Sequence, residues 1–211
     1  MAIDDLLDEH EQGERVRGWL RENGSGLLTG ILLGLALILG WQWWTQQRSH
    51  KQLQAGDDYQ AAIDALQAKK PDVARPHLAA LPDGAYATLG ALAMANAQVD
   101  AGKRDDAIAT LRAVKAGDPE LAAVVRQRLA RLLLDAGKPK DAMALLASDK
   151  DAPTAAAIRG DAYVALGQLA EARTAYGQAL SGLAVGSPLR NLVELKLTDA
   201  GGTPPNDGAR G

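Results

Sequence analysis

From Arg159 to Leu180 the chain reads RGDAYVALGQLAEARTAYGQAL, and this stretch decides the fold. Its alanines and leucines favour helix, because alanine costs the least free energy in a helix interior and leucine little more. Gly167 divides the stretch into two helical segments. Small and aromatic residues occupy regular places around that glycine: Gly160, Tyr163, Ala172, Tyr176 and Ala179. The stretch predicts a helix, a glycine turn and a second helix whose early alanine packs tightly against its neighbour.

The same unit recurs along the chain. An alanine followed four residues later by a large side chain recurs at intervals of 33, 35 and 30 residues: Ala74 with Leu78, Ala107 with Leu111, Ala142 with Leu146, and Ala172 with Tyr176. A glycine stands five residues before three of these alanines, at Gly102, Gly137 and Gly167. A period of about 34 residues with this pattern is typical of tetratricopeptide repeats. The first unit is degenerate, since Lys69 replaces its turn glycine.

An apolar segment precedes the repeats. Residues 23–47 are uncharged between Glu22 and Arg48, and about 20 mostly apolar residues suffice for a helix to cross a bilayer core of roughly 30 Å. No small-residue cleavage pattern follows and the preceding residues are acidic, so we expect a permanent anchor and not a signal peptide. The tryptophans flank this segment, where their amphipathic rings suit the membrane–water boundaries: Trp19, Trp41, Trp43 and Trp44.

Three glycines of this segment are spaced by four residues, at Gly26, Gly30 and Gly34. This spacing places them on one helix face, where small residues let another membrane helix approach closely. We expect them to mediate membrane-helix packing, either with another protein or with a second copy of the chain.

The predicted fold class is all-α, with a single N-terminal transmembrane helix followed by a tetratricopeptide-like α-solenoid of about four helix pairs plus a closing helix. The expected divisions are a short acidic N-terminal segment (1–22), the transmembrane helix (23–46), the repeat domain (47–199) and a disordered tail (200–211). We expect residues 1–13 to fray and residues 189–197 to form the closing helix. Four prolines fall where a helix must stop: Pro82, Pro119, Pro153 and Pro188.

The sequence offers no constellation for catalysis. The chain has no cysteine, and its three histidines are too scattered for a metal cluster: His10, His50 and His77. No basic run indicates nucleic acid, and the glycines of the apolar segment lack the lysine of a phosphate loop. We predict a chain that is not an enzyme, with no cofactor, metal, nucleic acid or small-molecule substrate.

What remains is a surface. Stacks of this kind curve, and the first helix of each pair lines a concave groove that binds other polypeptides. The repeat register places seven mixed polar and apolar residues there: Asn96, Val99, Gln127, Arg131, Leu134, Asp161 and Val164. We expect this groove to bind a partner, although each residue could equally pack against neighbouring helices.

A resemblance covers about residues 16–197. The block from Arg21 to Gly24, the glycines at 30, 34 and 40, Trp41 and Trp44, and the repeats that follow are similar to the YfgM family. Its members are ancillary subunits of the SecYEG translocon in Gram-negative bacteria. The resemblance implies a single-pass inner-membrane protein with a cytoplasmic N-terminus and a periplasmic repeat domain. It also implies association with the translocon, with a PpiD-like chaperone and with emerging secretory polypeptides.

Two other functions use the same architecture. One is a repeat-containing assembly factor for another membrane pathway, such as cytochrome maturation. The other is a membrane-anchored regulator that acts through the acidic cytoplasmic segment. The partners that co-purify would separate these alternatives.

Overall fold

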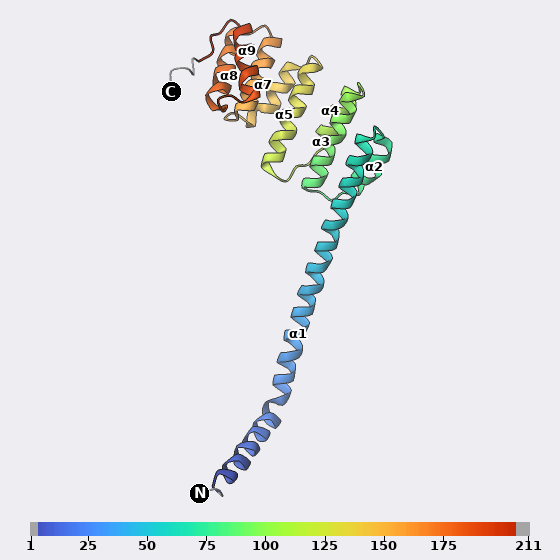
Figure 1. Cartoon of the computed structure of the whole chain (residues 1–211), viewed down its shortest axis with the longest axis vertical. Helices are drawn as coiled ribbons and strands as arrows, with labels where there is room; N and C mark the ends of the chain where they lie inside the picture. Colours follow the sequence, from blue (N-terminus) through green and yellow to red (C-terminus); the bar gives the residue numbers. More distant parts are fainter. Residues whose placement is uncertain (1–3, 206–211) are drawn as a thin grey trace. The chain divides into compact units, whose positions relative to one another are not determined.

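The computed structural model describes residues 4–205, with the side chains of 17–26, 28–47 and 52–205. This part of the chain contains no β-strand, and the all-α prediction is confirmed (Figure 1). Its helices are α1 (Asp4–Gln67), α2 (Pro71–Ala80), α3 (Ala85–Asp100), α4 (Arg104–Arg112), α5 (Pro119–Asp135), α6 (Pro139–Leu145), the short 3₁₀ helix η1 (Leu146–Ser148), α7 (Pro153–Ala165), α8 (Leu169–Gly182) and α9 (Pro188–Asp199).

The chain divides into two compact units, residues 1–54 and 55–211. In the second unit the last turns of α1 share a core cluster with Ala74 of α2 and so form the first pair. Three further pairs follow: α3 with α4, α5 with α6, and α7 with α8. The helix α9 packs against α8 and closes the stack. The prediction of four helix pairs and a closing helix is confirmed.

Four alanines set the distance between paired helices. Ala74, Ala107, Ala142 and Ala172 are each 0% exposed, one in every second helix. An alanine at a helix contact lets the two axes approach closely, because interaxial distance depends on the side chains between them. The regular alanine spacing in the sequence therefore reports helix packing.

The same turn joins the two helices of every pair. Its central residue, which we call the turn residue, has a positive φ: Lys69 (55°), Gly102 (73°), Gly137 (71°) and Gly167 (74°). In the third pair, Gly137 N–H donates to the carbonyl of Leu134 at 2.9 Å and Lys138 N–H to that of Leu133 at 2.8 Å. These bonds satisfy carbonyls at the end of the first helix. A fifth such turn, at Gly201 (79°), follows α9, so α9 has the geometry of a first helix.

Lys69 is the one turn residue among these five with a side chain that disfavours the left-handed region. We predict that Lys69→Gly stabilises the repeat unit by about 0.5–1 kcal/mol, because relief of steric strain exceeds the added flexibility of the unfolded chain. Gly137→Ala should lower the free energy of unfolding by about 1 kcal/mol, because alanine is strained at a positive φ. Urea unfolding of the full chain in detergent, followed by circular dichroism, measures both changes. Shifts of the same sign in the two variants would contradict this account.

The apolar segment lies within α1. From Leu28 onward this helix is long and apolar enough to cross a membrane, and the side chains of its most apolar window are exposed. The four tryptophans are exposed as well, and the rings of Trp41 and Trp44 meet edge to face with centroids 5.7 Å apart. A Cβ added at Gly26, Gly30 or Gly34 would meet no atom within 4 Å. That face of the helix therefore has room for a neighbour.

Two smaller expectations differ from the structure. α1 begins at Asp4, so the expectation of a frayed segment over residues 1–13 is wrong from that residue onward. The prolines were expected where helices stop, but three of them begin helices instead. Pro119, Pro153 and Pro188 are the first residues of α5, α7 and α9. Proline suits this place because the first helical N–H has no intrahelical partner and the fixed φ matches the helix. The expected disordered tail, residues 200–211, starts with Ala200, which is buried, and its residues 206–211 lie outside the described part.

Candidate functional site

The seven predicted groove residues share three places in the repeat. Asn96, Arg131 and Asp161 stand six residues before their turn residue, and Val99, Leu134 and Val164 stand three before it; Gln127 stands ten before. Because tetratricopeptide-like repeats stack in the same orientation, residues at the same place in equivalent helices are expected to share one face of the stack. We call the surface formed by these places on α1, α3, α5, α7 and α9 the groove face.

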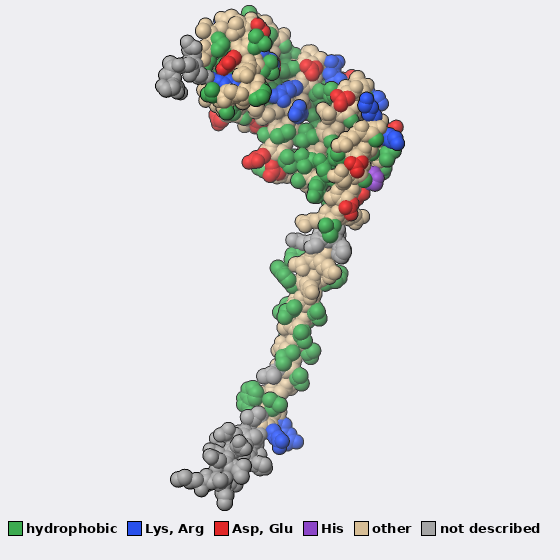
Figure 2. All heavy atoms as spheres, in the orientation of Figure 1, with side chains coloured by type: hydrophobic (Ala, Val, Ile, Leu, Met, Phe, Trp, Pro, Cys, Tyr) green, Lys and Arg blue, Asp and Glu red, His purple; other side chains and the backbone are tan. Residues whose placement is uncertain are grey.

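Aliphatic side chains run along the groove face. The place three residues before the turn holds Leu66, Val99, Leu134 and Val164, in all four pairs. Val99 and Val164 are 42% and 43% exposed. Exposed apolar side chains that gather on one surface, unlike scattered ones, mark sites of interaction. Figure 2 shows hydrophobic side chains gathered over α3 and α5.

Two further exposed aliphatic residues of the groove face were not predicted from the sequence. Leu89 and Val124 both stand thirteen residues before their turn residue and are exposed. The signal was available, because their separation of 35 residues equals that of the turn glycines Gly102 and Gly137.

At one end of the groove face, a pocket of about 480 Å³ opens between α1 and α3. Ile63, Leu66, Ala93 and Ala97 form its apolar lining, and Asn96 stands at its polar rim. Asn96 thus borders a pocket with a largely apolar lining.

At the other end, Asp161 is engaged within the chain. It accepts hydrogen bonds from Tyr176 Oη (2.7 Å) and from Lys196 Nζ, which lies 2.8 Å from both carboxylate oxygens. Burial and the Asp161 bond raise the pKa of Tyr176, which stays neutral. Asp161 and Val164 line a smaller pocket of about 250 Å³ beside these partners. Asp161 therefore joins α7, α8 and α9, and its role is at least partly structural.

Arg131 lies near this cluster. Burial lowers the pKa of Arg131, as does the neighbouring Arg128, and Asp161 partly opposes both effects. A partly desolvated guanidinium with several donors is suited to carbonyl or carboxylate groups of a polypeptide.

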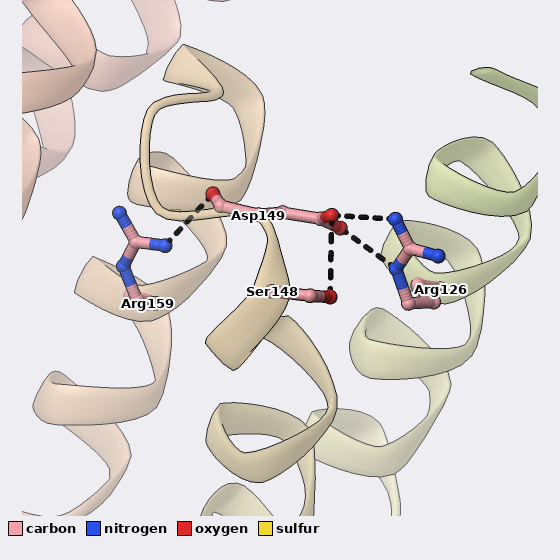
Figure 3. Close-up of polar contacts among 4 residues, drawn as sticks. All are labelled: Arg126, Ser148, Asp149 and Arg159. Carbon is pink, nitrogen blue, oxygen red and sulfur yellow. Dashed lines mark hydrogen bonds and ion pairs between the residues drawn. The ribbon is translucent and has the colours of Figure 1, made fainter. Parts of the chain in front are cut away.

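A second polar cluster fixes the loop after α6 (Figure 3). Arg126 of α5 donates Nε and Nη2 to the two carboxylate oxygens of Asp149. From the other side, Arg159 of α7 donates to the carbonyls of Asp149 (3.1 Å) and Lys150 (2.9 Å). The Asp149 bond raises the pKa of Arg126. The sequence analysis did not find this cluster, which ties three helices through one loop.

Among the residues whose side chains the structure describes, no group of three or more histidine, aspartate or glutamate side chains could hold a metal ion. His77 Nδ1 lies 3.0 Å from the Asp58 carboxylate and joins α2 to α1. His10 and His50 lie outside the described side chains.

Comparison with known proteins identifies the family. A family model described as a tetratricopeptide repeat-like domain matches residues 17–202. The chain is similar to the ancillary SecYEG translocon subunit of Escherichia coli (strain K12), at 29% identity over 199 residues, 91% of this chain and 96% of that one. It is also similar to the protein of the same name from Haemophilus influenzae, at 25% identity over 203 residues, 92% of this chain and 98% of that one.

The family model covers the apolar segment and every repeat. The chain therefore belongs to the tetratricopeptide repeat-like domain family, and its resemblance to the YfgM family is confirmed.

Proposed function

We propose that this chain is an ancillary, non-enzymatic subunit of the SecYEG translocon in the bacterial inner membrane. The carrying observation is that two relatives with that name align over more than nine-tenths of both chains. The apolar part of α1 spans the membrane once, with the N-terminus cytoplasmic and the repeat domain periplasmic. The membrane lipid is thus a further partner.

The groove face binds a PpiD-like periplasmic chaperone, emerging secretory polypeptides, or both. Exposed aliphatic side chains beside the polar groups of Asn96, Gln127 and Arg131 support this proposal, because apolar contact supplies affinity and polar groups fix orientation. A membrane anchor raises the effective concentration of the groove near a channel, so binding needs no high intrinsic affinity.

Photo-crosslinking tests the groove. A photoreactive amino acid at Gln127 or Arg131 should capture the chaperone or a secretory chain in intact membranes. The same amino acid at Lys140, exposed on the second helix α6, is the matched control and should capture neither. Equal capture from all three places, or none from the groove, would overturn the groove proposal.

The glycine face of α1 packs against a membrane helix of the complex. Gly30→Leu places a large side chain where an added Cβ now meets open space, and close approach of a second helix becomes impossible. We expect severalfold lower recovery of membrane partners from detergent extracts. Leu32→Ile, on the same apolar segment, is the control; equal recovery from both variants would contradict this role.

A further inference from the structure

The pocket between α1 and α3 has a specific structural cause. Two places on a first helix, nine and five residues before the turn residue, face the preceding first helix in α3 and α7. They hold Ala93 and Ala97 in α3, Arg128 and Leu132 in α5, Ile158 and Ala162 in α7, and Leu192 and Lys196 in α9. Of these four helices, α3 alone has alanine at both places.

The contacts of α3 and α7 show this orientation, whereas Arg128 and Leu192 at the same places of α5 and α9 are exposed. Ile158 lies in one core cluster with Val125 and Leu129 of α5. Lys196 reaches Asp161 of α7. Ala93 and Ala97 pack against a small cluster that includes Leu66 of α1. The side chain with which Ile158 fills the space between α5 and α7 therefore has no counterpart between α1 and α3.

The resulting space is large enough for such a side chain. Its volume is about 480 Å³, whereas an apolar cavity of about 150 Å³ already accommodates a benzene molecule. Ile63, Leu66 and the two alanines supply much of its apolar lining, beside the charged Lys69 and Asp100. An apolar group is the chemical match for the apolar part.

The rim adds groups that recognise a peptide backbone. Asn96 Nδ2 donates to the Asp100 carboxylate at 3.4 Å, a long bond, and the amide retains a second N–H and its carbonyl oxygen for a ligand. Gln67 offers a second amide beside the pocket. Paired donors and acceptors around an apolar floor suit a polypeptide segment, whose backbone carries both, better than a lipid chain, which carries neither.

We propose that this pocket binds one bulky aliphatic or aromatic side chain of a partner polypeptide, which occupies the place that Ile158 fills between α5 and α7. The inference rests on the proposed function and specifies it. The first two helix pairs bind one side chain of the partner segment, and the rest of the groove face contacts the remainder of that segment.

Methyl NMR of the full chain in lipid nanodiscs tests the proposal. Of the chain's six isoleucines, Ile63 lines the pocket, and Ile108 and Ile158 lie in a different core cluster. In a ¹³C-methyl isoleucine sample Ile63 is therefore the reporter, and Ile108 and Ile158 are the internal controls. The probe is an uncharged peptide of about ten residues with leucine at its centre, compared with the same peptide carrying serine. Leucine should shift the Ile63 signal with saturation and leave Ile108 and Ile158 unchanged, and serine should not.

A variant whose own side chain fills the pocket provides a second test. Ala97→Leu should weaken leucine-peptide binding about tenfold or more, since a bulky apolar side chain then loses its burial. Ala165→Leu, at an exposed place of α7, is the matched control and should bind as the original chain does. Unchanged Ile108 and Ile158 signals verify that both variants fold.

Three results would overturn the proposal: no Ile63 shift at saturating peptide, equal binding of the leucine and serine peptides, or full binding by Ala97→Leu. An Ile63 signal that follows lipid composition instead of peptide would identify a lipid chain as the occupant and would also overturn it. The experiment uses purified protein without the translocon. A failure to bind SecYEG would therefore contradict the proposed function and leave this result unaffected.

Discussion

Gly160→Ala is expected to destabilise the repeat unit by about 1–3 kcal/mol, the cost of overpacking a well-packed core. A Cβ at this place in α7 would overlap the Tyr176 ring of α8, with Cδ1 and Cζ 2.5 and 2.8 Å away. The ring cannot move aside easily, because it is 2% exposed and its hydroxyl donates to Asp161. The two helices must separate or the ring must leave its site.

Gly177→Ala is the matched control. It makes the same chemical change in the middle of α8, where an added Cβ meets nothing within 4 Å. The free energy of unfolding of that variant should rise by about 0.5–1 kcal/mol, because alanine loses less conformational freedom than glycine when the helix folds. Urea unfolding of both full-length variants gives the two free energies. If Gly160→Ala were as stable as Gly177→Ala, the contact between α7 and α8 described above would be wrong.

Asp149→Ala is expected to cost about 2–3 kcal/mol, since it removes hydrogen bonds between charged groups from a largely buried site. The Asp149 side chain is 8% exposed and Arg126 donates twice to it. In the variant the Arg126 guanidinium loses its partner but keeps partial access to water, because its side chain is 30% exposed. The loss of unfolding free energy is therefore smaller than for a fully buried ion pair.

The control for this change lies two residues away. Asp151→Ala removes an exposed carboxylate from the same loop and should change the free energy of unfolding by no more than about 0.5 kcal/mol. A double-mutant cycle with Arg126→Leu isolates the pair. A coupling energy near zero would show that Arg126 and Asp149 act independently.

The repeats were predictable from sequence because small residues at helix contacts cannot be exchanged for large ones without moving a backbone. The four buried alanines and the turn glycines carried that signal at intervals of 30 to 35 residues. One further row was equally visible and was missed: the place seven residues before the turn holds a buried small residue in every pair, namely Ala62, Ala95, Ala130 and Gly160. In α9 that place holds Glu194, which pairs with Arg190.

The groove was less predictable. Register alone assigned Asp161 to the groove face, but it cannot show that Lys196 approaches from α9, since that contact depends on how the closing helix packs. The Asp149 cluster was not predictable either, because its loop has no counterpart in the other pairs from which a pattern could be drawn. The pocket beside Asn96 arises from Ala93 and Ala97. Their small size indicates a pocket only when they are compared with the residues at the same places of the other first helices.

The central claim is that a membrane-anchored repeat domain works as a subunit of the translocon. The most direct measurement is affinity purification of the tagged full-length chain from alkaline-washed membranes in mild detergent, read by mass spectrometry. We predict that the chain stays with the washed membranes and that SecYEG subunits co-purify with it. Release of the chain by the wash, or recovery of cytochrome-maturation enzymes without SecYEG, would contradict the account.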